Sequence, residues 1–331
     1  MVAGAAPAVE PHDDAGDAPR HSENIELRVG GPALRGHPVH TARWLGGGTG
    51  PPVVMVHGLA GSHLNWTHLG PQLAARLDTR ELWAPDLAGF GRTPPVAGHA
   101  TVALQVQLLD AFLATVAPDE PSVVIGNSMG GLAALLHAAR HPAKVTALAL
   151  IAPATPIPAG RLPDTQIGTQ LGAIATPVLG PRLASEWLAR HRAEDHVDTH
   201  LRLCGIDPER FWDPDRAERI ELLAERQRAP HTATTLVEST RSTLAHVIGP
   251  ARGRVWEAVD RVTPPVLVIH GGRDRLVPVR ASVALATRRQ DWTLRIHPAY
   301  GHTPMMDAAD IIATDVETWR ASHRSSSRRR T

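Results

Sequence analysis

Short apolar runs alternate along the chain with longer segments in which apolar residues recur at helical spacing. Strands are expected at residues 25–29, 38–44, 53–56, 81–84, 123–125, 147–151, 266–269 and 293–297. Helices are expected at residues 64–76, 101–116, 129–140, 280–287 and 303–319. The inner strands are continuous runs rich in Val, Ile and Leu, as expected of strands that are covered on both faces. The alternation therefore predicts an α/β fold: a mostly parallel, eight-stranded sheet flanked by helices, with an antiparallel edge at the first two strands.

One long segment interrupts this alternation. Residues 155–260 are almost wholly helical in pattern and contain no convincing buried strand. We therefore expect a helical cap, inserted between two parts of one core at residues 23–154 and 261–322. Residues 1–22 are rich in Ala, Pro, Asp and Gly without periodicity, which predicts disorder. Residues 323–331 form an expected basic tail.

Composition narrows the classes of function. The chain of 331 residues is 43% apolar and carries a formal net charge of only +1, which argues against electrostatic capture of nucleic acid. No apolar stretch is long enough to span a bilayer, and the N-terminal residues have neither a basic leader nor an apolar signal core. A cytoplasmic protein acting on a small-molecule substrate is expected, while the oligomeric state stays open.

Cysteine and histidine usage gives no sign of a metal or cofactor. Cys204 is the sole cysteine, so neither an intrachain disulfide nor a cysteine-based metal cluster can form. The chain has 19 histidines, but none of their groupings has a strong ligand pattern. His191 and His196, for example, stand five positions apart and would share a helix face poorly. We expect no metal and no cofactor.

Ser128 is the expected catalytic nucleophile. It is the middle residue of the motif GNSMG at residues 126–130, between the strand at 123–125 and the helix at 129–140. A tight strand-to-helix turn of this kind strains its central residue and needs small neighbours, which Gly126 and Gly130 provide. The hydroxyl would then stand clear of the sheet at the positive N-terminal end of a helix.

The other groups that acyl transfer needs also follow predicted strands. His302 comes after the last strand and is the expected base, because histidine accepts and returns protons near neutral pH. Asp274 follows the strand at 266–269 and would orient and stabilise the imidazole ring. Backbone N–H groups of Met129 and Leu59 are expected to bind the oxyanion. Leu59 lies in the glycine-rich turn at residues 57–62, whose first residue, His57, is expected to be structural.

With these motifs in place, residues 25–319 resemble an α/β-hydrolase-fold enzyme with a helical cap. The order Ser128, Asp274, His302 along the chain is that of the family's triad. The turn at residues 85–91 also resembles the family's turn, in which Asp86 would be structural. The resemblance implies a serine hydrolase that cleaves a carboxylic ester, or a related acyl bond, of a small, largely apolar substrate through an acyl-enzyme. A serine nucleophile is not that of epoxide hydrolases or haloalkane dehalogenases, which use aspartate.

Other functions stay open at this point. The elbow at residues 126–131 also resembles that of the C–C bond hydrolases that cleave meta-cleavage products. Those enzymes have a tryptophan where this chain has Thr303, and a cap arginine, for which Arg182, Arg190 and Arg192 are candidates. A cofactor-free perhydrolase-like activity is mechanistically close. A non-catalytic, ligand-binding member of the fold is the alternative outside the enzymes.

Overall fold

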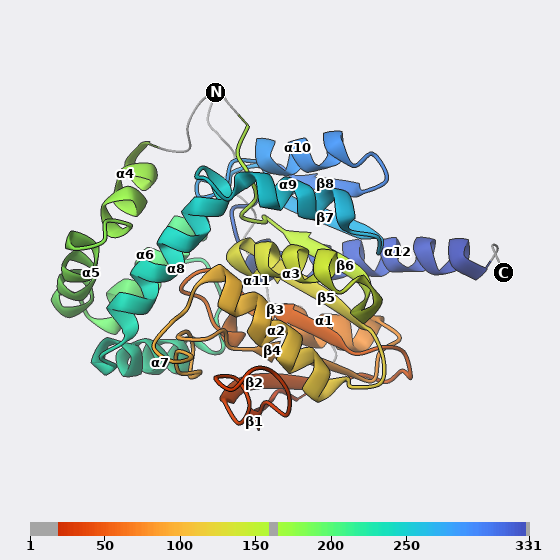
Figure 1. The fold of residues 1–331 in the computed structure, drawn as a ribbon, viewed down its shortest axis with the longest axis horizontal. Helices are drawn as coiled ribbons and strands as arrows, with labels where there is room; N and C mark the ends of the chain where they lie inside the picture. The colour runs from red at the N-terminus through yellow and green to blue at the C-terminus, as the bar shows by residue number, and fades with distance from the viewer. Residues whose placement is uncertain (1–18, 159–164, 329–331) are drawn as a thin grey trace.

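An eight-stranded sheet forms the centre of the molecule, with helices on both of its faces (Figure 1). This computed structural model describes residues 19–158 and 165–328. The strands are β1 (His21–Glu26), β2 (Pro38–Leu45), β3 (Val53–Val56), β4 (Glu81–Pro85), β5 (Ser122–Asn127), β6 (Val145–Ile151), β7 (Val266–Gly271) and β8 (Thr293–His297). Their order in the sheet is β1-β2-β4-β3-β5-β6-β7-β8. Strand β2 pairs antiparallel with β1 and β4, and the other pairs are parallel, so the expected fold class is confirmed.

Alternate residues of the inner strands point into two separate apolar cores. In β3, Val54 and Val56 belong to one core, whereas Val53 and Met55 belong to the other. The first core is covered by α2 (Val102–Val116), α3 (Ser128–Arg140), α9 (Arg252–Arg261) and α10 (Arg280–Arg288). The second is covered by α1 (Leu69–Arg76), α11 (Pro304–Asp307) and α12 (Ala309–Arg328). Burial on both faces explains the continuous apolar runs of these strands.

Several element boundaries differ from the expectation. Strand β1 begins at His21, inside the segment expected to be disordered, and its residues are mostly exposed. It forms by pairing along the edge of β2, which a polar sequence can do without an apolar pattern. Residues 1–18 lie outside the described part of the chain.

Two of the expected helices are interrupted. The helix expected at 64–76 is a 3-10 turn, η1 (His63–Trp66), followed by α1. The helix expected at 303–319 divides into α11 and α12 at Ala308, whose backbone is not helical. Helix α12 continues to Arg328, so most of the expected tail is helical.

Between β6 and α9 the chain forms α4 (Thr165–Ile174), α5 (Leu179–Arg190), α6 (Ala193–Cys204), α7 (Arg216–Arg228) and α8 (Thr232–Val247). We call α4 to α8 the helical insertion; it lies at one end of the sheet (Figure 1). Helices α5 and α8 share a small apolar cluster of their own, which includes Leu188 and Val237. The expected cap also contained α9, but Val255 and Val259 of α9 belong to the first core, so α9 is part of the core layer.

Among the described helices, none combines the length and the apolar character that a membrane span requires.

Candidate active site

Ser128 stands at a sharp turn between β5 and α3. Its backbone φ of +53° lies in the left-handed region, which a non-glycine residue adopts only where the surrounding structure imposes it. A Cβ atom at Gly126 would come within 2.7 Å of the Gly130 carbonyl oxygen, and one at Gly130 within 2.3 Å of the His57 carbonyl oxygen. Both glycines are therefore required by close backbone contacts on either side of the serine.

His302 and Asp274 form a buried pair beyond the ends of β8 and β7. The His302 Nδ1 lies 2.7 Å from Asp274 Oδ2, so the ring donates its Nδ1 proton to the carboxylate. The backbone N–H groups of Leu276 and Val277 donate to Asp274 Oδ1 at 2.8 and 2.9 Å. Burial alone would raise the pKa of Asp274, but the charges and hydrogen bonds of His302 and His270 hold it well below its usual range. The carboxylate thus stays ionised and fixes the orientation of the imidazole.

Asn127 connects the serine turn to the histidine loop, a contact that the sequence did not predict. Its side-chain Nδ2 donates to the backbone carbonyl oxygens of His302 and Ile151, both at 3.1 Å. On the other side of the turn, the N–H group of Ala154 donates to the Ser128 carbonyl oxygen at 3.0 Å. A hydrogen bond therefore links Asn127, the residue before Ser128, directly to the backbone of His302, the expected base. Among the described residues, no hydrogen bond joins the Ser128 hydroxyl to the His302 ring itself.

The glycine-rich turn after β3 packs against the serine. A Cβ atom at Gly58 would lie 3.0 Å from the Cβ atom of Ser128. His57 holds this turn in place, since its Nδ1 donates to the Gly58 carbonyl oxygen at 2.8 Å and its Nε2 accepts from the Leu87 N–H at 2.9 Å. Burial lowers the pKa of His57 to about 4, so the ring is neutral and can do both. Leu59 follows directly in this turn.

Met129 is the second residue of α3 and is fully buried. The first N–H groups of a helix have no partner within the helix. The Met129 N–H belongs to the first turn of α3 and directly follows Ser128.

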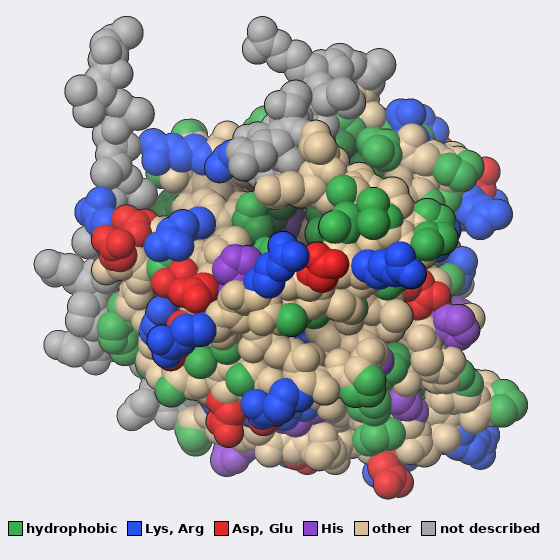
Figure 2. All heavy atoms as spheres, turned by 90° about the vertical axis from the view of Figure 1, so that its left-hand side faces the viewer, with side chains coloured by type: hydrophobic (Ala, Val, Ile, Leu, Met, Phe, Trp, Pro, Cys, Tyr) green, Lys and Arg blue, Asp and Glu red, His purple; other side chains and the backbone are tan. Residues whose placement is uncertain are grey.

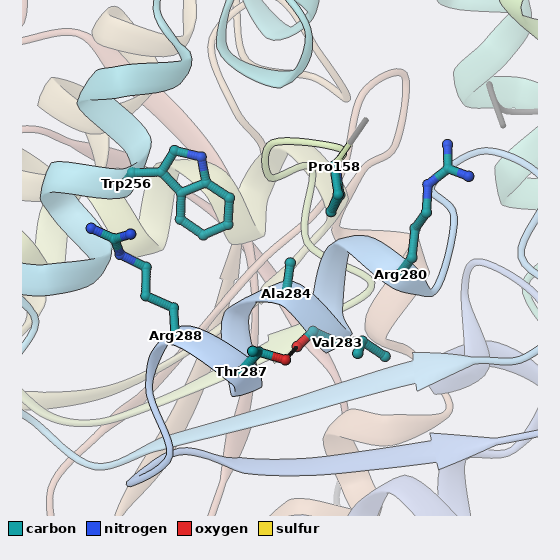
Figure 3. Close-up of a pocket in the computed structure, with 7 residues that line it drawn as sticks. All are labelled: Pro158, Trp256, Arg280, Val283, Ala284, Thr287 and Arg288. Carbon is teal, nitrogen blue, oxygen red and sulfur yellow. Dashed lines mark hydrogen bonds between the residues drawn. The ribbon is translucent and has the colours of Figure 1, made fainter. Parts of the chain in front are cut away.

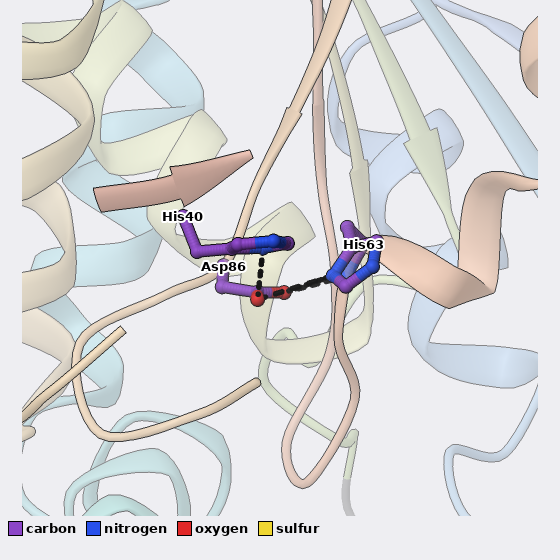
Figure 4. Close-up of side chains that lie close together, drawn as sticks. All are labelled: His40, His63 and Asp86. Carbon is purple, nitrogen blue, oxygen red and sulfur yellow. Dashed lines mark hydrogen bonds and ion pairs between the residues drawn. The ribbon is translucent and has the colours of Figure 1, made fainter. Parts of the chain in front are cut away.

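Asp86, His40 and His63 form a second buried cluster (Figure 4). The Asp86 carboxylate accepts from the N–H groups of His63 at 2.6 Å and Arg92 at 2.9 Å, and from the ring nitrogens of His40 at 3.0 Å and His63 at 3.1 Å. Although burial opposes ionisation, the two histidines hold the pKa of Asp86 well below its usual range. His63 Nε2 also lies 3.5 Å from Glu218 of α7. Both rings lie within hydrogen-bonding distance of the carboxylate, so the cluster joins β2, η1 and the turn after β4 in one buried network.

The end of α6 lies against the loop that carries His302. The backbone N–H of His302 donates to the Cys204 carbonyl oxygen at 2.7 Å. Gly205, with φ of +88°, packs so closely that a Cβ atom there would lie 3.0 Å from Gly301 Cα. Burial raises the pKa of the Cys204 thiol to about 12, which makes it a poor nucleophile. The helical insertion therefore helps to position the histidine loop.

The three candidate cap arginines are remote from such a role. Arg182, Arg190 and Arg192 are all exposed, and the latter two pair with Glu186 and Glu194. Figure 2 shows basic and acidic side chains intermixed over this end of the molecule. The arginine expected against a substrate carboxylate in a C–C bond hydrolase is thus not provided by these residues.

A shallow groove on the core surface contains none of the candidate site residues. Its volume is about 540 Å³ and it lies between α9 and α10 (Figure 3). It is lined by Pro158, Trp256, Arg280, Val283, Ala284, Thr287 and Arg288.

Comparison with known proteins agrees with this architecture. Residues 51–309 match the family model for the alpha/beta hydrolase fold. A pimeloyl-[acyl-carrier protein] methyl ester esterase of Aromatoleum aromaticum is 28% identical over 281 residues, which are 81% of this chain and 97% of that protein. The monoacylglycerol lipase abhd6-B of Xenopus laevis is 26% identical over 266 residues, covering 78% of this chain and 72% of that protein.

Solved structures share the fold at lower identity. The 2-hydroxy-6-oxo-6-phenylhexa-2,4-dienoate hydrolase of Rhodococcus sp. strain RHA1 superposes with a TM-score of 0.63 at 24% identity, covering 89% of this chain and 98% of that one. The family match spans most of the chain, and the named relatives are esterases and lipases. The chain belongs to the α/β-hydrolase family and is an enzyme of the hydrolase class.

Proposed function

We propose that the protein is a serine-dependent carboxylesterase that cleaves a small, largely apolar ester through an acyl-enzyme. Ser128 is the nucleophile, His302 the general base and Asp274 the carboxylate that orients it. The observation that carries the proposal is the connection between the two halves of the site: Asn127 bonds the serine turn to the His302 backbone, while Asp274 holds the His302 ring.

The reaction follows from the roles of these groups. His302 Nε2 takes the hydroxyl proton as Ser128 Oγ attacks the ester carbonyl carbon, and Asp274 stabilises the imidazolium that forms. The N–H groups of Leu59 and Met129 bind the carbonyl oxygen as it becomes negative, which is worth on the order of 3 kcal/mol per donor. The intermediate collapses, and the alcohol leaves with the proton from His302. Water then attacks the acyl-enzyme with the same base.

The hydrogen bonds of His302 agree with this role. Its Nδ1–H is engaged in the hydrogen bond to Asp274, so Nε2 is the ring nitrogen that can accept a proton. The contact between a nucleophile and its base often tightens only when substrate binds. The loop is held at three points, by Asn127, Asp274 and Cys204, which limits the movement needed for the two groups to meet.

We also propose that the helical insertion acts as a cap over the site. Support comes from the contact of its α6 with the His302 loop at Cys204 and Gly205. A cap in this position would exclude water from the acyl-enzyme and give the substrate pocket its shape.

Two other functions, C–C bond cleavage and non-catalytic ligand binding, would be distinguished by the experiment described below. C–C bond cleavage is favoured only by the elbow motif and by a fold shared with one such hydrolase. Thr303 in place of tryptophan argues against it. A non-catalytic binding protein would not need a buried histidine–carboxylate pair beside a strained serine.

Hydrolysis of p-nitrophenyl acetate and butyrate by the wild type tests the proposal. Ser128→Ala and His302→Ala should each abolish most turnover, and the double variant should lose little more, because the residues act in one step. Asp274→Asn should show a smaller but severe loss. Ser22→Ala, an exposed serine in β1, serves as the matched control and should be unchanged. Equal hydrolysis by the wild type and Ser128→Ala would refute the proposal, and faster turnover of a dienoate ring-fission product would favour C–C cleavage.

A further inference from the structure

Arg226 of α7 points from the helical insertion toward the core. Its guanidinium carbon lies 5.0 Å from the centre of the Phe90 ring, and Nη2 lies 3.4 Å from the Gly89 carbonyl oxygen. Both partners belong to the turn after β4. The guanidinium packs against this turn, and the residue as a whole is half-buried.

This cation has no counter-charge. On the same helix, Arg216 pairs with Asp198 at 2.7 Å and Arg219 with Asp213 at 2.9 Å. No carboxylate among the described residues lies within ion-pair distance of Arg226. A guanidinium has five N–H donors, and here one of them makes a single long hydrogen bond to a neutral carbonyl. Buried cations are otherwise paired, because desolvation is costly.

The buried surroundings of the guanidinium make its unpaired positive charge more costly. Burial lowers the pKa of Arg226 to about 10, and the more distant charge of Asp86 offsets only part of that effect. An anion placed beside Arg226 would restore the pairing that the protein itself does not provide. A planar carboxylate fits best, since two of its oxygens can accept in parallel from the guanidinium fork.

Contacts connect Arg226 to both sides of the proposed reaction centre. The Phe90 ring packs edge-on against His57, with ring centres 6.1 Å apart, and His57 holds the Gly58 turn beside Ser128. On the other side, burial lowers the pKa of His200 to about 4, and the nearby charges of Arg219, His302 and Arg226 lower it further. Arg226 is therefore connected by contacts to the glycine-rich turn beside Ser128, and its charge and that of His302 both act on His200.

We propose that Arg226 binds a carboxylate carried by the ester substrate, away from the bond that is cleaved. This inference rests on the proposed esterase function and adds a substrate class to it: monoesters that bear a second, free carboxylate. Without that group the substrate would leave the arginine unpaired, so the acid form is selected over its neutral analogue.

Matched pairs of esters test the inference. On the acyl side, mono-p-nitrophenyl esters of succinate, glutarate and adipate are compared with p-nitrophenyl butanoate, pentanoate and hexanoate. On the alcohol side, carboxymethyl butanoate is compared with ethyl butanoate in a pH-stat. The wild type should favour at least one acid ester over its neutral partner by about tenfold or more in kcat/KM, the scale expected of a charge-assisted hydrogen bond.

Variants of α7 separate specificity from structure. Arg226→Gln should lower kcat/KM for the acid ester at least about fivefold more than kcat/KM for its neutral partner, mainly through KM, because only the acid ester contacts the charge. Arg226→Lys should retain part of the preference, since it keeps the charge but not the fork. Arg228→Gln, an exposed position on the same helix, is the control and should behave like the wild type.

The outcomes distinguish this inference from the proposed function. A wild type that hydrolyses neutral esters through Ser128 but never favours an acid ester would overturn the inference alone, as would an equal loss on both esters in Arg226→Gln. If no ester is hydrolysed, the proposed function fails. The role of Arg226 is then tested by measuring the Kd of the acid monoesters for the Ser128→Ala variant. Adding Arg226→Gln to that variant should weaken binding of whichever of these acid monoesters binds most tightly by about tenfold, and an unchanged Kd would overturn the inference.

Discussion

Asn127 offers a test of how the two halves of the site are held together. The residue is 2% exposed, and its side-chain Nδ2 supplies both hydrogen bonds, to the carbonyl oxygens of His302 and Ile151. Asn127→Ala removes both bonds and leaves two buried carbonyl oxygens without this donor. Asn127→Asp keeps the shape but places a carboxylate oxygen where Nδ2 stood, facing both carbonyl oxygens.

The magnitude follows from the number of bonds. Each hydrogen bond contributes about 1 kcal/mol net, and a stranded buried polar group costs about 1–3 kcal/mol. We therefore expect Asn127→Ala to lower the free energy of unfolding by about 2–4 kcal/mol. The loop would remain held by Asp274 and Cys204, but a displacement of even 1 Å costs on the order of 100-fold in rate. A fall in kcat of about 10- to 100-fold is expected.

Urea unfolding and ester hydrolysis measure the two effects separately. Asn127→Asp should be less stable than Asn127→Ala at pH 8, and should recover as the pH falls, because its protonated carboxyl can donate one bond. Asn24→Ala, in the exposed strand β1, is the control and should match the wild type. If Asn127→Ala retains wild-type stability and kcat, the contact to His302 does not organise the site, and the reasoning is wrong.

Three further predictions concern the packing and the charges around the site. Gly130→Ala should lower the unfolding free energy by about 3 kcal/mol, since the added Cβ would lie 2.3 Å from a backbone carbonyl oxygen. Gly253→Ala is the control and should change it by less than about 1 kcal/mol, because nothing lies within 4 Å of its Cβ position. Equal urea midpoints for the two variants would contradict this reasoning. Burial opposes protonation of His63, but its two carboxylate partners outweigh burial and raise its pKa, so its stabilising contribution is complete below about pH 6.5 and is lost as the pH rises through the folded pKa. The loss of stability in His63→Gln should thus be larger at pH 6 than at pH 9 in urea titrations, and a constant difference would argue against it. Burial raises the pKa of Asp307 to about 7, so its ionisation destabilises the fold as the pH rises, and Asp307→Asn should gain about 1–3 kcal/mol at pH 8 relative to pH 4; no gain would rule out a buried, unpaired carboxyl.

Features with a local physical cause could be predicted from the sequence. Apolar runs such as the one that forms β3 mark strands buried on both faces, because each residue must face one of two cores. The glycines around Ser128 mark a turn in which backbone atoms approach too closely for a side chain. Since parallel strands end at one edge of a sheet, the residues after β5, β7 and β8 were expected to meet there.

Features that lack a local pattern could not be predicted from the sequence. Strand β1 is polar and exposed, and only its pairing with β2 makes it a strand. Helix α9 has the periodicity of any amphipathic helix, so the sequence does not say whether Val255 faces the insertion or the core.

By itself, then, the sequence determined the α/β class, the order of the strands and helices, and three candidate catalytic residues, because periodicity and backbone sterics act over a few neighbouring residues. Only the tertiary structure decided which partners these residues have. The Asn127 bond to His302 spans 175 positions and the contact of Arg226 with Gly89 spans 137. Such contacts depend on how loops from separate strands and helices pack, and no spacing along the chain encodes that.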